Sequence, residues 1–449
     1  MSAAIEKSYF SHWFRLNILF LGLLMACHPD PDDFGETEIL PWYDGKKMAI
    51  SITYDDGTVN QFQKALPIMN ELGMPGTFYI NTGEIPGSQY QAKFIGRELK
   101  EIVEESASVA TDRENLFERA SAIRMIDMSG AVEMHNQAGA LFEQGKEEEA
   151  IAVVEKALAQ ARGLNQVRER TPRVLEGPRT DWDAIREFAS QGHEFGVHTI
   201  SHPRLAVMDE DNLLYELLNC REDILNELGP EHTFSAECPF GTEDERVMEY
   251  ALAHFEGLRN IMPMDSLHEV NRWGHYDPTY DQKPYVQWQR GPLGDTTLTQ
   301  KKAWVDRALD AKHHPWLVLV YHGIDGLGWE PQSSDSVRAY FEYIHGKDDQ
   351  IWVGTFKEVT QYLKQRMAAS VDIQPEKDQI IIYLTHNLGE RFDHPMTLRT
   401  QVPGNWDEFR VLQGGQEISY NMAESGATGQ WVHYNVLPNA EEIVLEQVR

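Results

Sequence analysis

The pattern of apolar and polar positions is clearest between Met48 and Ile80, where it predicts a strand, a helix and a second strand. The apolar run Ala49–Tyr54 is typical of a buried strand and stops at Asp55-Asp56-Gly57. The next segment has apolar residues at helical spacing and a glycine as its stop signal, namely Phe62, Leu66, Ile68, Met69, Leu72 and Gly73. Thr77–Ile80 is the second apolar run. Two carboxylates therefore follow the first strand directly, at the strand end where α/β folds keep their chemistry.

Strand and helix patterns continue to alternate along much of the chain. Amphipathic segments, the longest at residues 209–228, lie between short apolar runs at residues 193–197, 233–236, 257–259, 316–321 and 351–354. This alternation predicts an α/β fold, a distorted (β/α) barrel, complete or incomplete, over residues 46–368.

A long helical segment interrupts the alternation at about residues 95–178. It carries helix formers and Glu/Lys pairs at helical spacing, and His135–Gly163 is similar to one tetratricopeptide hairpin. A single repeat cannot form a solenoid, because each repeat buries its apolar face against its neighbours. We therefore expect a helical insertion lying over the main domain, and docking of a protein partner on it stays open as a further role.

After about Ala369 the pattern changes to short alternating strands. Turn residues such as Pro403-Gly404-Asn405 and Gly414-Gly415 separate them. We expect residues 369–449 to form a small all-β sandwich as an accessory domain. Its strands do not reveal whether it binds carbohydrate or braces the barrel.

Length and charge narrow the classes of protein. A chain of 449 residues is long enough for two or three domains. Lys and Arg number 40 against 71 Asp and Glu, which gives a formal net charge of −31. This balance argues against nucleic acid as a partner and against adhesion to anionic membranes through charge.

The first residues have a different chemistry. Lys7 and Arg15 precede the apolar stretch Leu16–Ala26, which is too short to span a bilayer comfortably but suits the core of a signal peptide. Leu24-Met25-Ala26-Cys27 resembles the bacterial lipoprotein box, in which the cysteine is lipidated. We expect a lipoprotein-type signal peptide over residues 1–27, with an uncleaved anchor or an ordinary secretory peptide as the alternatives.

The polar residues that follow fit a flexible tether, which we assign to residues 28–45. The expected location is the cell envelope outside the cytoplasm, with the protein held to the membrane by lipid on Cys27. Only Cys220 and Cys238 remain after that position, and they either pair or are buried as small hydrophobic residues.

Four predicted strand ends carry groups that could take part in chemistry. They are Asp55 with Asp56, His198 with His202, the turn Pro239-Phe240-Gly241, and His322. Two histidines with a nearby carboxylate suit zinc or a similar divalent ion, and leave positions open for water and substrate. Any one of these histidines alone fits a structural role, but four such elements at strand ends favour a common site.

These motifs resemble those of the polysaccharide deacetylase family, which is also known as carbohydrate esterase family 4 or the NodB-homology family. Thr53-Tyr54-Asp55-Asp56-Gly57 is similar to its first motif, Thr-Phe-Asp-Asp-Gly. His198-Thr199-Ile200-Ser201-His202 resembles its His-Ser/Thr-x-x-His metal motif, and Leu319-Val320-Tyr321-His322 resembles its last motif, which ends in the catalytic histidine. The resemblance covers roughly Lys46–Leu363 apart from the insertion, and implies a barrel of the NodB type.

The resemblance also implies roles for single residues. Asp56, His198 and His202 would hold a divalent metal, with Zn²⁺ as the first choice, which polarises the acetyl carbonyl. Asp55 would be the general base for the attacking water, and His322 the acid that protonates the departing amine or alcohol. The backbone N–H of Phe240 matches the family position that helps to stabilise the tetrahedral oxyanion.

Two features depart from the family pattern. Members with the Arg-x-Pro-Tyr form of the third motif place an arginine near the base, where this chain has Glu237. An ionised Glu237 would raise the pKa of Asp55, so either the base is tuned differently or Glu237 points away and another group compensates. No aspartate clearly matches the one that orients the catalytic histidine, and Asp277 and Asp281 are both candidates.

The sequence therefore predicts a lipid-anchored, metal-dependent hydrolase that removes acetyl groups from a carbohydrate, with N-deacetylation of an N-acetylated glycan as the first choice. An O-acetyl esterase on a polysaccharide such as xylan is the alternative, because the same water attack serves esters and amides. A non-catalytic glycan-binding lipoprotein with this fold also stays open, although binding alone needs neither a base nor an acid. Trp329 could stack on a sugar ring, yet an aromatic residue in a loop is as often a packing residue.

Overall fold

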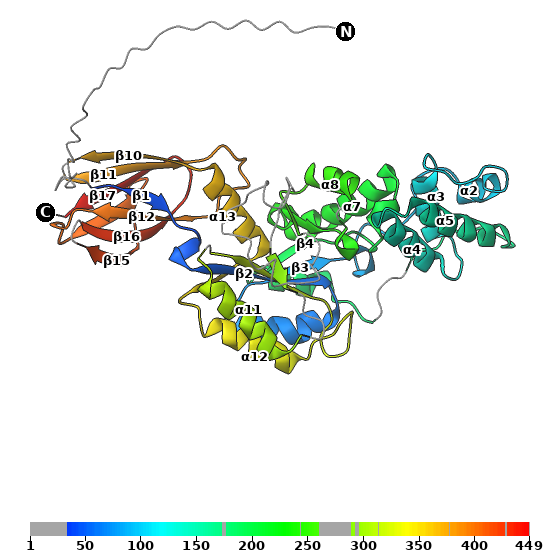
Figure 1. Ribbon diagram of the computed structural model, residues 1–449, viewed down its shortest axis with the longest axis horizontal. Helices are drawn as coiled ribbons and strands as arrows, with labels where there is room; N and C mark the ends of the chain where they lie inside the picture. The colour runs from blue at the N-terminus through cyan, green and yellow to red at the C-terminus, as the bar shows by residue number, and fades with distance from the viewer. Residues whose placement is uncertain are drawn as a thin grey trace, which may run out of the picture.

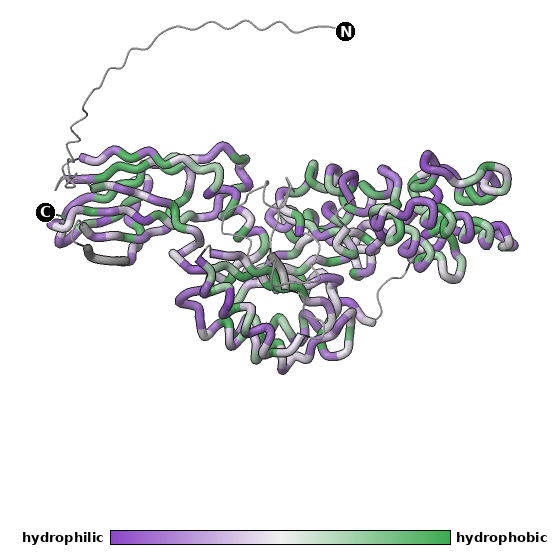
Figure 2. The backbone as a smooth tube through the Cα atoms, viewed as in Figure 1, coloured by the Kyte–Doolittle hydropathy of each residue, from purple (hydrophilic) through white to green (hydrophobic). Residues whose placement is uncertain are grey.

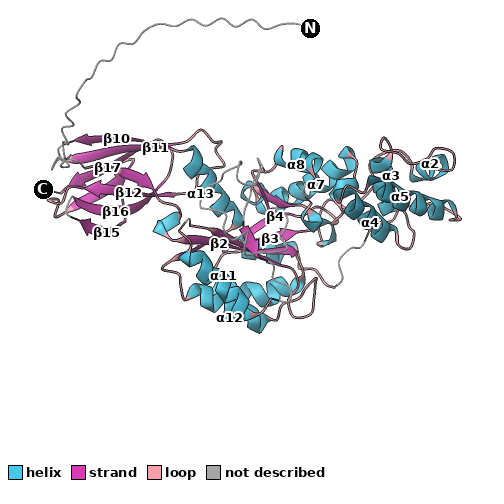
Figure 3. Cartoon of the chain, in the orientation of Figure 1, coloured by secondary structure: helices cyan, strands magenta, loops and turns pink. Residues whose placement is uncertain are grey.

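Three parts of the chain lie in a row in the computed structural model: a C-terminal β-module, a central α/β domain and a helical insertion (Figure 1). The structure describes residues 34–172, 177–242, 244–259, 289–291, 296–312, 314–376, 378–426 and 429–448. Strands make up the β-module and the core of the central domain, whereas the opposite end of the molecule is helical (Figure 3).

The central domain is built on a parallel sheet of eight strands in the order β6-β5-β4-β3-β2-β8-β7, with β9 paired to the start of β2. These strands are β2 (Met48–Asp56), β3 (Thr77–Ile80), β4 (Glu194–Val197), β5 (Ser235–Glu237), β6 (Gly257–Arg259), β7 (Gln289–Gly291), β8 (Trp316–Tyr321) and β9 (Ile351–Val353). The accompanying helices are α1 (Leu66–Glu71), α6 (Trp182–Ala189), α7 (Glu210–Leu228), α8 (Glu245–Leu252), α11 (Leu298–Asp310), α12 (Ser334–His345) and α13 (Phe356–Ala368). The predicted α/β class is confirmed, and the barrel is a half-barrel.

Strand β2 lies at the centre of this sheet, and all nine of its residues are buried. Its C-terminal half pairs with β3 on one side, and Ala49–Tyr54 pairs with β8 on the other. Tyr54 stacks with Phe78 and Tyr321, with ring centroids 5.0 and 5.1 Å apart. Apolar residues are concentrated in these strands (Figure 2). The packing on both faces fixes where the two carboxylates at the end of β2 emerge.

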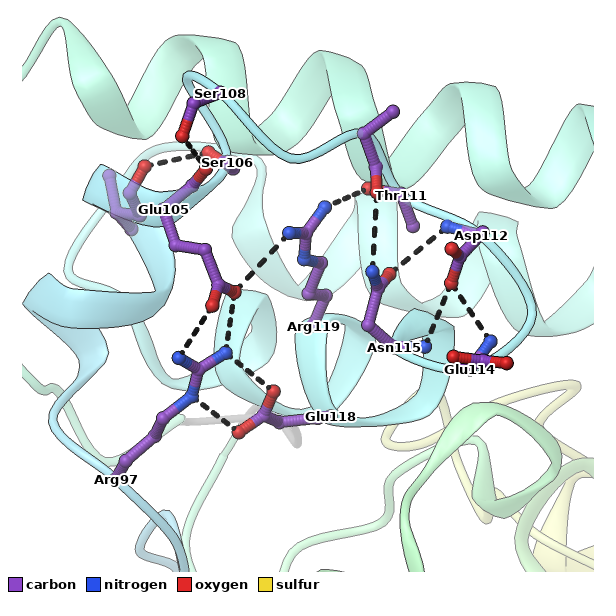
Figure 4. A network of polar contacts seen from close by, with 12 residues as sticks. Arg97, Glu105, Ser106, Ser108, Thr111, Asp112, Glu114, Asn115, Glu118 and Arg119 are labelled. Carbon is purple, nitrogen blue, oxygen red and sulfur yellow. Dashed lines mark hydrogen bonds and ion pairs between the residues drawn. The ribbon is translucent and has the colours of Figure 1, made fainter.

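The helical insertion contains α2 (Leu99–Glu105), α3 (Leu116–Met125), α4 (Ala131–Glu143) and α5 (Glu147–Arg162). Ion pairs tie α2 to α3 (Figure 4): Arg97 contacts Glu105 at 2.6 Å and Glu118 at 2.8 Å. The buried Arg119 donates to the Thr111 hydroxyl at 2.8 Å and lies 3.4 Å from Glu105. Apolar residues of α3, α4 and α5 belong to the same hydrophobic cluster as β2 and β3. The insertion is therefore an integral part of the domain core.

The β-module consists of two antiparallel sheets, as the alternating pattern after Ala369 predicts. One has the order β1-β12-β16-β15 and the other β10-β11-β17-β13-β14. The strands are β1 (Thr37–Ile39), β10 (Ser370–Glu376), β11 (Gln379–Thr385), β12 (Met396–Val402), β13 (Phe409–Gln413), β14 (Gln416–Ile418), β15 (Tyr420–Gly426), β16 (Gly429–Val436) and β17 (Glu442–Gln447).

Strand β1 corrects the prediction that residues 28–45 are a flexible tether. Thr37–Ile39 pairs in antiparallel register with Leu398–Thr400 of β12, and the Thr37 and Thr400 hydroxyls are hydrogen-bonded at 3.0 Å. Three residues are too few to show a strand pattern in the sequence, and their order in the structure comes from the long-range partner. The tether prediction is wrong from residue 34 onward, and residues 28–33 lie outside the described part of the chain.

The β-module and the central sheet share one hydrophobic cluster. It joins Trp316 and Val318 of β8 and Tyr362 of α13 to core residues of the β-module such as Ile382 and Val432. Continuous apolar packing of this kind resists relative movement more than a polar interface does. The β-module is therefore attached firmly to the domain that carries the site.

Two smaller questions from the sequence concern the cysteines and the membrane. Cys220 and Cys238 are both buried and free, so they do not form a disulfide bond with each other.

Among the residues that the structure describes, we find no helix long and apolar enough to cross a bilayer. The predicted signal peptide and Cys27 lie outside those residues.

Two buried histidines predict that acid destabilises the fold. Burial lowers the pKa of His193 and of His232 to about 4, and each Nδ1 accepts a backbone N–H at 3.1 Å, from Gly76 and Phe195. The unfolded chain, with a histidine pKa near ~6.5, takes up these protons first as the pH falls. The contribution of neutral His193 and His232 to the free energy of unfolding is therefore complete above about pH 6.5 and is lost between that pH and about 4.

We expect the melting temperature to fall across this window when it is measured by circular dichroism. The His193→Gln variant keeps an acceptor for Gly76 but has no titrating group, so its melting temperature should depend less on pH. An equal pH dependence in both proteins would contradict this role of His193.

Candidate active site

The predicted site residues come together at one edge of the central sheet, where the parallel strands end. Asp55 and Asp56 are the last residues of β2, and His198 and His202 follow β4. The turn Pro239–Gly241 follows β5, and His322 follows β8. The carboxyl ends of parallel strands share one edge, so groups far apart in the sequence meet there.

Asp56, His198 and His202 form a group that could hold a metal ion. Their ligand atoms lie within 4.8 Å of one another. Asp56 Oδ1 is 3.6 Å from His198 Nε2 and 3.5 Å from His202 Nε2. This buried oxygen has no hydrogen-bond partner among the described residues, as expected of an atom that faces a cation. One carboxylate oxygen and two imidazole nitrogens are a donor set that suits zinc and similar divalent ions.

The histidine orientation supports the same conclusion. His198 Nδ1 donates to the backbone carbonyl of Glu237 at 2.8 Å, which leaves Nε2 as the acceptor that faces Asp56. Metal-binding histidines commonly use their second nitrogen in this way. Burial opposes the ionisation of Asp56, but the nearby His198 and His202 outweigh this effect and lower the pKa of Asp56. The residues present therefore fit a divalent metal.

Several backbone torsions at the site are unusual for residues other than glycine. Asp56, Thr199, His202 and Phe240 have φ values of 75°, 68°, 55° and 64°. Residues with side chains adopt positive φ only when the surroundings impose it, and such residues cluster at functional sites. The Thr199 hydroxyl accepts the His202 N–H at 2.9 Å, which holds the tight turn between the two histidines.

Arg259 lies between Asp55 and Glu237, the residue that stands where the family motif has an arginine. Its guanidinium donates to Asp55 Oδ2 and, at 3.1 Å through Nε, to Glu237 Oε2. The three side chains are at most 4% exposed. Burial favours the neutral acid, but Arg259 and His322 outweigh it and lower the pKa of Asp55. Glu237 does not point away, because its carboxylate accepts from the same guanidinium as Asp55, and it is Arg259 on strand β6 that supplies the positive charge beside Asp55.

His322 lies next to the same carboxylate. Its Nε2 is 3.3 Å from Asp55 Oδ2. Burial lowers the pKa of His322, and Asp55 and Asp56 oppose that shift. Asp277 and Asp281, the candidates for orienting this ring, lie outside the described residues, so that role stays a prediction.

Gln61 is a site residue that the sequence interpretation missed, as it missed Arg259. Its side-chain amide donates to the backbone carbonyls of Asp55 at 2.5 Å and His322 at 2.7 Å. It therefore ties the ends of β2 and β8 together from the first turn after Gly57. For Gln61 the sequence signal was a polar residue on the inward-packing face of a helix. For Arg259 it was a charged residue at the end of a buried strand.

Two exposed aromatic side chains flank the polar groups. The Phe240 ring is 39% exposed and its centroid is 4.7 Å from that of His202. Trp329 is 59% exposed, and its ring lies edge-on to His322 with the ring centroids 4.7 Å apart. Exposed aromatic rings beside polar groups of this kind offer apolar faces to a ligand.

An aspartate and two histidines that could hold a metal ion lie beside a second carboxylate and a third histidine at the carboxyl edge of a parallel sheet. This arrangement is typical of a metal-dependent hydrolase. Residues 43–255 match the sequence model of the family described as polysaccharide deacetylase. The chain therefore carries a domain of this family of carbohydrate deacetylases and esterases, as its motifs predict. The match spans Asp55, Asp56, His198, His202 and Phe240, and His322 lies beyond it.

Individual relatives are distant. A curated protein from a Bacillus species named gellan lyase is 26% identical over 260 residues, which are 52% of this chain and 10% of that protein. This chain thus spans a tenth of the length of that relative. The structure of peptidoglycan deacetylase PdaC from Bacillus subtilis is 11% identical, covers 73% of this chain and 96% of its own, and has a TM-score of 0.34. A family 4 carbohydrate esterase from Bacillus anthracis is 12% identical, with coverages of 73% and 86% and a TM-score of 0.33.

Proposed function

We propose that this protein removes acetyl groups from an N-acetylated glycan by metal-dependent hydrolysis. The observation that carries the proposal is the position of Asp55, which lies beside Asp56 of the metal-ligand group and 3.3 Å from His322. The proposed base, the proposed acid and the three candidate metal ligands are therefore neighbours at one edge of the sheet.

The site residues have separate tasks in this reaction. Asp55, kept ionised by Arg259, takes a proton from the water whose oxygen attacks the acetyl carbonyl carbon. His322 protonates the departing nitrogen as the C–N bond breaks, and the 3.3 Å separation lets it receive the proton that Asp55 has taken. The Phe240 N–H stabilises the charge on the carbonyl oxygen. A divalent metal held by Asp56, His198 and His202 would supply Lewis acidity, and we propose Zn²⁺.

We favour an N-acetyl substrate over an O-acetyl ester because His322, the proposed acid, lies next to Asp55, the proposed base. An amine leaves only after it has been protonated, whereas an alcohol is a better leaving group. A site with its own proton donor is equipped for the harder bond, although it also serves an O-acetyl ester. The presence of both a candidate base and a candidate acid weighs against a protein that only binds glycans, because binding requires neither group.

We propose two further features that accompany this function. Trp329, exposed beside His322, would stack on a sugar ring next to the acetylated one. Lipid on Cys27 would hold the protein in the cell envelope. A Cys27→Ala variant that still partitions into the detergent phase of a Triton X-114 extraction would contradict this anchor.

Acetate release tests the function. We expect the protein without residues 1–27, loaded with Zn²⁺, to release acetate from N-acetylglucosamine oligomers or peptidoglycan fragments with a higher kcat/KM than from acetylated xylan. Removal of the metal with a chelator should abolish the release, and added Zn²⁺ should restore it. Trp329→Ala should raise KM more than it lowers kcat. Release from xylan alone would identify an esterase, and tight zinc binding without any release would favour the binding protein.

A further inference from the structure

Arg204 connects the metal motif to the helical insertion. It lies two residues after His202, and its side chain crosses α4 at Gly139. A Cβ atom on Gly139 would lie 2.4 Å from Arg204 Cδ and 2.6 Å from Cγ. Glycine is unfavourable in the middle of a helix compared with alanine, so its presence in this 13-residue helix needs a local reason. The close passage of Arg204 supplies that reason.

The head of Arg204 is held at both sides. Its guanidinium pairs with Glu143, which lies four residues after Gly139 and therefore on the same face of α4. The guanidinium carbon also lies 4.1 Å from the centroid of the Phe240 ring. The second carboxylate oxygen of Glu143 accepts the hydroxyl of Thr242, two residues after Phe240. One carboxylate on the insertion thus binds the turn directly, through Thr242, and indirectly, through Arg204.

The turn held in this way is one that a free chain would avoid. Phe240 has a φ of 64°, and its ring packs against the metal-ligand candidate His202. The buried Arg124 of α3 lies 3.8 Å from Glu216 and donates to the backbone carbonyl of Ser201. The insertion therefore also binds the loop between His198 and His202. The helices of the insertion therefore contact both the Phe240 turn and the loop between His198 and His202.

We infer that the helical insertion is part of the active site, in which Gly139, Glu143 and Arg204 are positioning residues that hold the Phe240 turn in its strained conformation. The inference rests on the proposed function, because it gives the Phe240 N–H a task in hydrolysis. With this role the insertion contributes to the reaction, and docking of a protein partner is not needed to explain why the insertion is present.

Three variants of the full chain test this inference. Gly139→Ala should displace Arg204 although alanine is the better helix former, and Glu143→Ala should release both Thr242 and Arg204. Each should lower kcat about 10²-fold, as expected when an oxyanion donor is misplaced, with KM changed less than threefold. Glu143→Gln retains oxygen and should restore much of the rate. Gln137→Ala, an exposed substitution on the same helix, is the matched control and should leave kcat unchanged.

Hydrogen–deuterium exchange supplies a readout that does not depend on turnover. The backbone amides of Cys238 and of residues 240–242 should exchange faster in Gly139→Ala and Glu143→Ala, while the melting temperature and the affinity for Zn²⁺ stay near those of the wild type. Wild-type kcat and wild-type exchange in both variants would overturn the inference, and so would exchange raised equally throughout the insertion. A wild-type protein without acetate release would instead refute the proposed function, and the exchange data would still decide whether the turn is held.

Discussion

Asp55→Asn is expected to lower the rate of acetate release by roughly 10²–10⁴-fold, the range for loss of a general base. Asparagine has the same shape and keeps an oxygen for Arg259, but it cannot take a proton from the attacking water. Asp56, His198 and His202 are untouched, so zinc affinity should change little. Single-turnover acetate release and zinc titration on the same preparation separate the two properties.

Asp183→Asn is a suitable control for this variant. Its side chain is 90% exposed and pairs with Arg186 of the same helix, so the same chemical change should leave the rate unaltered. If Asp55→Asn lost zinc along with activity, Asp55 would be a metal ligand and not the base. Undiminished release would remove Asp55 from the mechanism.

Arg259→Met is expected to destabilise the protein by about 3–5 kcal/mol, the range for removing one partner of a buried ion pair. The variant would leave two buried carboxylates, Asp55 and Glu237, without their shared cation. Adding Glu237→Gln should recover part of the loss, because one buried negative charge is then removed. Thermal and urea unfolding of the single and double variants measures both effects.

The chain offers a matched control on its surface. Arg186 also pairs with two carboxylates, Asp183 and Glu227, but its side chain is 43% exposed. Exposed ion pairs contribute at most ~1 kcal/mol, so Arg186→Met should shift the unfolding transition far less. Similar losses in Arg259→Met and Arg186→Met would mean that the buried cluster contributes no more than a surface pair.

Local patterns predicted the parts of the fold that depend on local chemistry. Apolar runs such as Ala49–Tyr54 and Trp316–Tyr321 are strands because they are buried on both faces, and the site residues were predictable because they end such strands. The candidate metal ligands His198 and His202 are separated by a spacing that a short turn fixes, and Asp56 does come together with them.

The remaining parts depend on partners that the sequence places far away. Arg259 reaches Asp55 across 204 positions, and only the order of strands in the sheet brings β6 within range of β2. Gln61 acts through backbone carbonyls, which leave no signature in the side-chain pattern. Strand β1 has three residues and takes its structure from β12.

Strand β1 also determines the order in which the protein can fold during synthesis. It lies beside β12 although the two belong to opposite ends of the chain (Figure 1). Thr37 is separated by 363 positions from its partner Thr400. At roughly 5–20 residues per second, a ribosome needs about 20–70 s to pass from one to the other. During that time β1 is an unpaired strand on a nascent chain, and the β-module closes only after the central domain has been made.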